Sequence, residues 1–383
     1  MCVITTSVPN KTAKQGLSLC LTDAAPLRGR AFVVRFWSEP RSLALYLWPS
    51  LCLLVALTAC GPTAPPAPAG RWVHRASMEA ERSWIGMANV GGKLFAIGGM
   101  VGSLGQRLDS NEVYDPRANE WHYRAPMPTA RSSPGAVAIG ATIYLFGGNA
   151  VSGTTTVVEA YDTVRNVWRT GLAPMPAKRF DLAALALDGR IYAIGGYDTG
   201  PTNVAEVYDP AQDRWQPLPP MPTARYALQA VAVDGKIWVL GGRDAAGPTD
   251  IIEVFDPAAQ RWSAGGRLPE PVAAFGAAVE SGKLHVVKYD KHFELDLATG
   301  SWRSLPPMPT SRHGLQLAFI GRDLYAVGGC EPDGTLFDVA KNEVYLTNER
   351  PPHPVERDGL GALAVLAVVM LAAALLVPRL GLS

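Results

Sequence analysis

The chain has 383 residues, a formal net charge of +1, 48% hydrophobic residues and 18% charged residues. This composition excludes a disordered chain, and a charge near zero is not that of a basic nucleic-acid-binding protein, so no nucleic-acid partner is expected. Five cysteines are too few for a disulfide scaffold, whereas 38 glycines, 32 prolines and 10 tryptophans indicate a turn-rich all-β repeat.

The charge is unevenly distributed along the chain. Residues 1–60 hold six Lys or Arg and two Asp or Glu, a net charge of +4. Residues 61–378 hold 28 basic and 32 acidic residues, a net charge of −4. The basic charge therefore belongs to a leader, and the body of the protein is acidic.

The leader has the layout of a secretory signal peptide, because an uncharged apolar stretch runs from Ser42 to a small-residue boundary at Cys60. The tetrapeptide Leu57-Thr58-Ala59-Cys60 resembles the bacterial lipobox, and this resemblance implies a lipidated Cys60 as the mature N-terminus. An uncleaved anchor helix and a plain cleaved signal are the alternatives. Residues 61–70 are rich in Pro and Ala and predict an extended tether.

One pattern recurs between residues 71 and 347, in steps of 40 to 49 residues. Each copy has a short apolar run before a glycine pair, and an aromatic residue that precedes a Trp by seven positions. The pairs are Gly98-Gly99, Gly147-Gly148, Gly195-Gly196, Gly241-Gly242 and Gly328-Gly329, with Lys288-Tyr289 in the fifth copy; the aromatic residues and Trp are Tyr114/Trp121, Tyr161/Trp168, Tyr208/Trp215 and Phe255/Trp262, with Leu295/Trp302 in the fifth.

This combination in register resembles the kelch repeat. The resemblance covers about residues 71–347 and implies a β-propeller in which each blade is one four-stranded sheet. Such a sheet is apolar on both faces and is stable only between neighbours. We expect the glycines to let the backbone pass beneath a large side chain.

The position of Trp72 predicts how the ring closes. Trp72 precedes Arg82 by ten residues, as Trp121 precedes Arg131, and no Trp follows the last copy. The N-terminal strand therefore completes the last sheet, and the predicted fold is an all-β, six-bladed propeller without a free sheet edge.

Charged residues recur at two positions of the repeat. The glutamates, two residues before the third-strand aromatic, are Glu112, Glu159, Glu206, Glu253 and Glu343, and the arginines that open the first strand are Arg82, Arg131, Arg179, Arg225 and Arg312. The fifth copy has Phe293 and Val272 instead, so it has lost both together. We predict structural ion pairs between the Glu and the Arg of the same sheet.

Strand alternation brings the loops between second and third strands and the loops between successive sheets to one face. The candidate binding residues on this face are Trp84, Met100, Ser132, Asn149, Lys178, Phe180, Asp181, Tyr197, Tyr226, Arg243 and His313. Such a mixed aromatic and polar rim suits a peptide or a sugar.

Catalytic signals are weak. Cys330 is the only cysteine after Cys60, the six histidines form no i,i+4 pair, and no Gly-rich phosphate loop is present. We therefore predict no metal, no cofactor and no catalytic residues. Some kelch propellers are copper oxidases, and their cross-linked Tyr and His ligands have no matching set here. Others are sialic acid mutarotases.

The C-terminal part predicts a linker at 348–358, a transmembrane helix at 359–378 and a short tail at 379–383. Residues 359–378 are uncharged, and a helix of this length spans about 30 Å. The function expected is that of an extracytoplasmic propeller, attached to a bacterial cell membrane through Cys60, the helix or both, that binds a protein or a glycan. The alternative is a sugar-active enzyme resembling the mutarotases.

Overall fold

The structure is a computed structural model that describes residues 70–102, 104–332 and 338–347. All of these residues belong to one compact unit, Pro65–Ser383. Cys60 and the rest of the leader, residues 61–69 of the tether, the linker 348–358, the apolar segment 359–378 and the tail lie outside the described residues. Within the described residues, the structure contains no helix of the length and apolar character that crossing a membrane requires.

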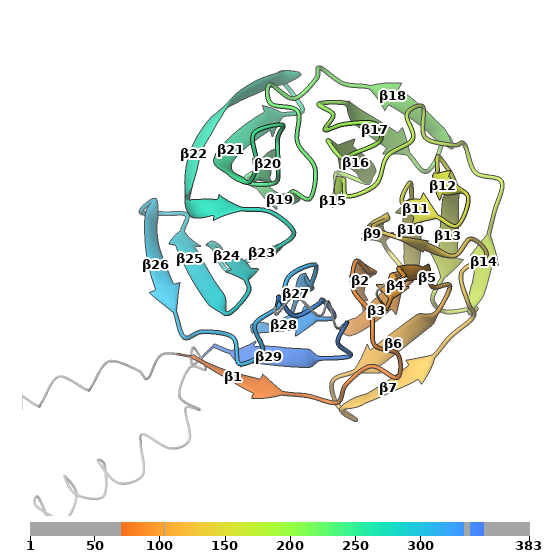
Figure 1. The fold of residues 1–383 in the computed structure, drawn as a ribbon. Coiled ribbons are helices and arrows are strands. Elements are labelled where there is room, and N and C mark those ends of the chain that lie inside the picture. The colour runs from red at the N-terminus through yellow and green to blue at the C-terminus, as the bar shows by residue number, and fades with distance from the viewer. Residues whose placement is uncertain (1–69, 103, 333–337, 348–383) are drawn as a thin grey trace, which may run out of the picture. The chain divides into compact units, whose positions relative to one another are not determined.

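The described residues form six four-stranded antiparallel sheets arranged in a ring (Figure 1). The first sheet consists of β2(Gly86–Val90), β3(Lys93–Ile97), β6(Asn111–Asp115) and β7(Glu120–Tyr123). The second consists of β9(Gly135–Ile139), β10(Thr142–Phe146), β13(Val158–Asp162) and β14(Val167–Arg169). The third consists of β15(Ala183–Leu187), β16(Arg190–Ile194), β17(Ala205–Asp209) and β18(Arg214–Pro217).

The other three sheets complete the ring. The fourth sheet consists of β19(Gln229–Val233), β20(Lys236–Leu240), β21(Thr249–Asp256) and β22(Arg261–Val272). The fifth consists of β23(Gly276–Glu280), β24(Lys283–Lys288), β25(Lys291–Asp296) and β26(Ser301–Leu305). The sixth consists of β27(Gln316–Ile320), β28(Asp323–Val327), β29(Asn342–Leu346) and β1(Arg71–His74). The innermost strand of each sheet contacts those of both neighbours around the whole ring. This is the arrangement of a β-propeller.

Closure of the ring follows the prediction made from Trp72. Strand β1 pairs antiparallel with β29, and Trp72 lies opposite Tyr345. The Trp72 indole N–H donates to the carbonyl of Pro306 at 3.0 Å, and its ring centroid lies 5.4 Å from that of Tyr345. The two ends of the propeller are thus joined within one sheet, and β29 has no free edge.

The tryptophans link neighbouring sheets. The indole N–H groups of Trp121, Trp168, Trp215 and Trp262 each donate to a backbone carbonyl of the segment that enters their sheet, at 2.8 to 3.0 Å. Their rings pack on the third-strand aromatic seven residues earlier, with centroids 5.0 to 5.2 Å apart. The repeat position of the Trp is therefore explained by both packing and a buried hydrogen bond.

The glycine pairs allow close approach of both backbone and side chains. All ten glycines have a positive φ, and a Cβ on Gly98 would lie 2.5 Å from the carbonyl oxygen of Arg131 in the next sheet. A Cβ on Gly99 would lie 2.7 Å from the carbonyl oxygen of Ser83. Side chains also lie against the glycines, as expected, since a Cβ on Gly98 would lie 3.0 Å from the Met127 methyl carbon and a Cβ on Gly99 would lie 2.9 Å from Ile85. The closest approach is nevertheless that of backbone carbonyls, and only glycine combines it with the left-handed conformation.

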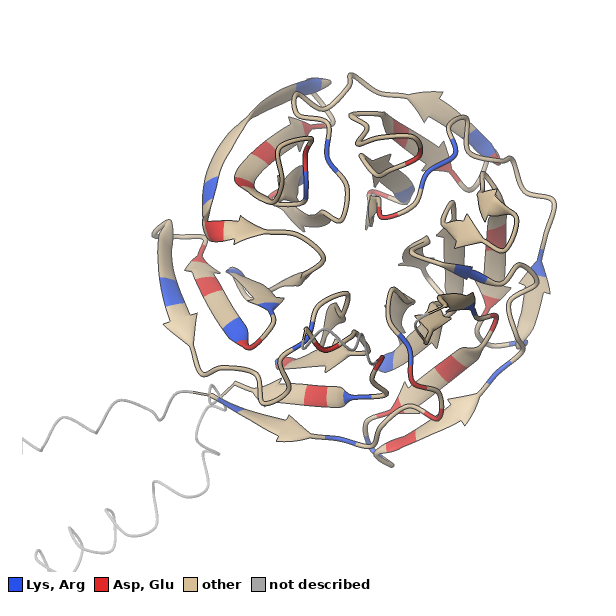
Figure 2. Cartoon of the chain, in the orientation of Figure 1, with Lys and Arg blue, Asp and Glu red and all other residues tan. Residues whose placement is uncertain are grey.

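The predicted Glu and Arg residues meet within each of five sheets. Arg82–Glu112 and Arg131–Glu159 are 2.7 and 2.9 Å apart, Arg179–Glu206 and Arg225–Glu253 are each 2.7 Å apart, and Arg312 pairs with Glu343. All ten residues are buried. Figure 2 shows the acidic residues of the third strands recurring around the ring.

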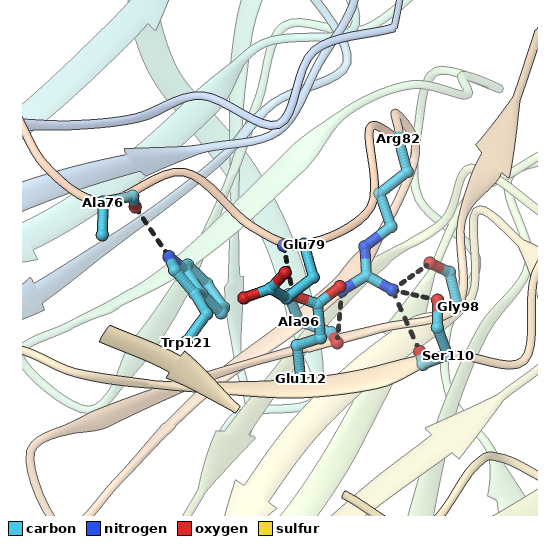
Figure 3. Close-up of polar contacts among 8 residues, drawn as sticks. All are labelled: Ala76, Glu79, Arg82, Ala96, Gly98, Ser110, Glu112 and Trp121. Carbon is cyan, nitrogen blue, oxygen red and sulfur yellow. Dashed lines mark hydrogen bonds and ion pairs between the residues drawn. The ribbon is translucent and has the colours of Figure 1, made fainter. Parts of the chain in front are cut away.

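Figure 3 shows how the first pair is held. Arg82 donates to the carbonyls of Ala96 and Ser110 as well as to Glu112, and the second carboxylate oxygen of Glu112 accepts the backbone N–H of Glu79 at 2.8 Å. Both charges are compensated, and the pair ties the entering segment to the second and third strands.

The fifth sheet has a buried histidine pair that the sequence pattern did not reveal. His285 Nδ1 and His292 Nε2 are 2.9 Å apart, and His285 Nε2 lies 3.6 Å from Glu294, which is paired with Arg303. Burial lowers the pKa of His285 to about 4 and lowers the pKa of His292 as well. His292 also packs on Trp72 and Tyr345, the residues that close the ring.

We expect this pair to make the propeller sensitive to acid. The unfolded chain binds a proton at His285 below about pH 6.5, and the folded protein does so only near pH 4, so the stability that depends on this group is full above pH 6.5 and falls between these values. Burial lowers the pKa of His292 as well, so its effect on stability has the same sign. His285 alone contributes a loss of about 3 kcal/mol over this range. Chemical denaturation as a function of pH measures it.

The test replaces each histidine by a residue that another sheet has at the equivalent position. The double variant His285→Phe and His292→Val should have a flatter stability profile between pH 6.5 and 4. The variant His122→Gln, at an exposed histidine on β7, should keep the wild-type profile. An unchanged slope in the double variant would show that the buried pair is not the source of acid sensitivity.

Candidate ligand-binding face

The two sets of loops meet on one face, as strand alternation predicts. Short antiparallel bridges join the segment that enters each sheet to the segment that follows its second strand. These bridges are Ser83–Met100, Ser132–Asn149, Phe180–Tyr197, Tyr226–Arg243 and His313–Cys330. Eight of the eleven candidate residues thus lie in these bridges. Trp84 and Asp181 are directly beside a bridge, and Lys178 precedes Phe180 by two residues.

A closed ring of backbone hydrogen bonds surrounds the axis at this face. Six residues, one from the entering segment of each sheet, have left-handed φ between 50° and 66°: Trp84, Ser133, Asp181, Ala227, Ala274 and Gly314. The N–H of each donates to the carbonyl of the equivalent residue in the preceding sheet, at 2.7 to 3.2 Å, and Trp84 donates to Gly314. The ring fixes six backbone positions around one opening and compensates their strained conformation.

A small cavity with a volume of about 40 Å³ lies at this opening. Its polar lining comes from Ser133, Asp181, Gln229 and Gln316, and its apolar lining includes Trp84 and the buried residues that follow the ring positions. Burial raises the pKa of the Asp181 carboxyl to about 6, and a hydrogen bond with Ser133 opposes this shift. The cavity thus combines apolar walls with a few polar groups, as small-ligand sites do.

Aromatic side chains form two groups on this face; Trp84 lines the cavity, and Phe180 and Tyr226 each precede a lining residue in the sequence. Tyr197 lies between Phe180 and Tyr226, with centroids 5.5 and 4.8 Å apart, and all three are half-buried. On the other side of the opening His313 lies between Trp84 and Tyr289, at 6.2 and 5.8 Å. The first group presents apolar ring surface with phenol hydroxyls, a combination suited to a ligand with both apolar and polar surface.

The charged candidates behave differently from one another. Lys178 is paired with Asp198 at 3.4 Å. Arg243 is exposed and makes no ion pair among the described residues. Lys288, which the sequence analysis did not select, has its ammonium 4.8 Å from the centroid of the Tyr289 ring and likewise makes no ion pair there.

Three candidate residues have mainly structural positions. Ser132 is buried, and it pairs with Asn149 in the small sheet of β8(Arg131–Ser132), β11(Asn149–Ala150) and β12(Gly153–Thr154). Met100 lies in the hairpin of β4(Met100–Val101) and β5(Gln106–Arg107). The residues that sequence reasoning missed are Ser133, Gln229, Lys288, Tyr289 and Gln316. The missing glycine pair at Lys288-Tyr289 was a usable signal, because it places two side chains where the other sheets have none.

Metal and thiol chemistry find little support in the described residues. No group of three or more His, Cys, Asp or Glu among them is arranged to hold a metal ion. The Cys330 sulfur lies 3.5 Å from His313 Nε2, but burial raises the pKa of the thiol to about 11 and lowers that of His313. The two groups are therefore a neutral thiol and a neutral imidazole near pH 7, without a reactive thiolate.

Comparison with known families agrees with this architecture. A model of the kelch motif matches residues 82–128, 130–171, 178–222 and 224–269. The chain carries kelch repeats. These four matches coincide with the first four kelch sheets of the ring. The fifth lacks the glycine pair, and the sixth is divided between both ends of the propeller.

Among solved structures, the one titled "Structure of YjhT" is similar to this chain, with a TM-score of 0.62 and 15% sequence identity. The match covers 71% of this chain and 97% of that one. At this identity the similarity shows a shared fold alone. Since 1104 chains of solved structures match, the fold is widespread and does not by itself assign a function. Among curated proteins, none matches the chain.

Proposed function

We propose that this protein is a glycan-binding module, and that the ligand lies on the cavity face of the propeller. The observation that carries the proposal is the aromatic group Phe180, Tyr197 and Tyr226 beside a cavity with polar lining. Sugar rings have apolar C–H faces that pack on aromatic rings and hydroxyls that need hydrogen-bond partners. A small concave site with both features favours a glycan over a folded protein as the ligand.

We further propose that the module is attached to the outer side of a bacterial cell membrane. This rests on the sequence alone, that is, on the lipobox at Cys60 and the apolar segment 359–378, which lie outside the described residues. Metabolic labelling of the full chain with a fatty acid tests it. Label that disappears in Cys60→Ser supports lipidation, and absence of label in the wild type contradicts it.

Glycan binding predicts a specific role for Tyr197, whose ring contacts both other aromatic residues of the group. On a glycan array, the variant Tyr197→Ala should bind at least about tenfold more weakly than the wild type, because it removes the central stacking surface. Tyr123→Ala, which changes an exposed tyrosine on the outer strand β7, is the matched control and should bind normally. Lack of binding to every glycan, with binding to a protein instead, would overturn the proposal.

A second candidate function is that of a sugar-active enzyme similar to the mutarotases. The observation that favours it is Asp181, since a carboxyl with a pKa of about 6 in a cavity is suited to general acid–base catalysis near neutral pH. An anomerisation assay with the sugars selected by the array, and with sialic acid, tests it. Turnover that Asp181→Asn abolishes while binding remains would establish the enzyme, and binding without turnover would eliminate it.

A further inference from the structure

The fifth sheet has a short connection on the cavity face. Strands β24 and β25 are joined by Tyr289 and Asp290 alone, whereas the other five sheets use at least eight residues between their second and third strands. The shortest of these five connections is 241–248, and the longest is 328–341. The rim of the face therefore carries less backbone at the fifth sheet than anywhere else around the described ring.

The fifth sheet also has side chains at the position where the other sheets have a glycine pair. In the other sheets a Cβ at the first glycine would lie 2.5 to 3.0 Å from a carbonyl oxygen of the next sheet, so no side chain fits there. Lys288 instead remains in the β24 strand, paired with Lys291, and the left-handed conformation is confined to Tyr289 with a φ of 56°. Loss of the glycine pair thus adds a Lys and a Tyr side chain to the face.

The ammonium group of Lys288 lacks a compensating anion. Lys288 is half-buried, and it makes no ion pair among the described residues. The nearby carboxylate of Glu270 is already paired with Lys291 at 2.5 Å. Burial lowers the pKa of Lys288, the positive charges of Arg243 and Lys291 lower it further, and Glu270 opposes this shift. Arg243 follows β20 and Lys288 ends β24, the second strands of two neighbouring sheets whose inner strands are in contact, so both cations lie at adjacent positions on the same face.

Aromatic residues connect these two cations with the cavity. Arg243 forms a backbone bridge with Tyr226, a member of the aromatic group. The Tyr289 ring packs on His313, and His313 packs on Trp84, which lines the cavity. A half-buried charge without a partner is costly, and a ligand of opposite sign removes this cost. An Arg beside a Lys provides charge-assisted hydrogen bonds for a carboxylate or a sulfate.

We infer that Arg243 and Lys288 form a subsite for an anionic group, so that the glycan bound on this face is an acidic one. This inference rests on the proposed function and adds the chemical class of the ligand. The anionic group lies between the fourth and fifth sheets, and the attached sugar lies along the aromatic residues at the cavity opening.

Titration calorimetry of the full chain tests the subsite with three probes of equal length: a galacturonic acid oligomer, its carboxyl-reduced galactose counterpart and a sulfated galactose oligomer. The acidic probes should bind at least about tenfold more tightly than the neutral one. Lys288→Gln and Arg243→Gln should each weaken the acidic probes about tenfold and change the neutral probe less than twofold. Lys288→Arg, which keeps the charge, should retain most of the affinity.

Two matched controls remove a positive charge from the opposite face. Lys236→Gln in the fourth sheet and Arg190→Gln in the third should leave the binding of all probes unchanged. Equal affinity for acidic and neutral probes, or an effect of Lys288→Gln no larger than that of Lys236→Gln, would overturn the subsite and leave glycan binding intact. Binding of none of the probes, or of any glycan on the array, would overturn both.

Discussion

Replacing Arg82 by Met should lower the free energy of unfolding by about 3–5 kcal/mol, because it leaves the Glu112 carboxylate buried without its cation. Both side chains are fully buried, and their closest atoms are 2.7 Å apart. The carbonyls of Ala96 and Ser110 lose a donor as well. The effect should exceed that of most single core substitutions in this protein. Chemical denaturation followed by fluorescence measures it.

The double variant Arg82→Met and Glu112→Leu identifies the origin of this loss. It removes both charges, so we expect a total cost well below the sum of the two single effects. Lys93–Asp115, an ion pair at 2.8 Å in the same sheet with half-exposed Lys93, is the control. Lys93→Met should cost less than about 1 kcal/mol, since solvent screens this pair. Additive effects of the two buried substitutions would contradict a coupled pair.

Replacing Trp72 by Ala should destabilise the whole ring by about 3–5 kcal/mol. Strand β1 is joined to β29 by pairing and side-chain contacts, with more than 260 residues of chain between them. Trp72 supplies both the hydrogen bond to Pro306 and the packing on Tyr345 and His292. Without these contacts β1 separates from the sheet and leaves the edge of β29 exposed. Thermal unfolding and light scattering measure the loss of stability and the resulting aggregation.

Trp168 offers a matched comparison for this effect. It occupies the same repeat position in the second sheet, and its indole makes the equivalent hydrogen bond, to Ala125. A short turn connects its strand β14 to β13, so the strand stays in place when the indole is removed. Trp168→Ala should therefore cost less than Trp72→Ala and should not promote aggregation. Equal effects of the two substitutions would mean that β1 does not depend on Trp72.

Features that recur in every copy could be derived from the sequence alone. The spacing of glycine pair, aromatic residue and Trp resembles the kelch repeat, and this resemblance implied a propeller of four-stranded sheets. The position of Trp72 predicted the closing strand. The simultaneous loss of Arg and Glu in the fifth copy predicted that each pair forms within one sheet, as the distances show. Each of these inferences concerns the internal geometry of one repeat unit, and closure could be included because Trp72 supplies the one strand that the last unit lacks.

Features that join different repeats depended on the tertiary structure. The ring of hydrogen bonds through Trp84 and Gly314, the cavity beside Asp181 and the placement of Arg243 and Lys288 on neighbouring sheets bring together residues of separate sheets. Periodicity reports which side chains are buried, but the distances between sheets depend on how many sheets close the ring and how they tilt. The sequence by itself therefore determined the sheets, their pairing and their closure, and only the packing of the sheets around one axis decided which side chains share the candidate site.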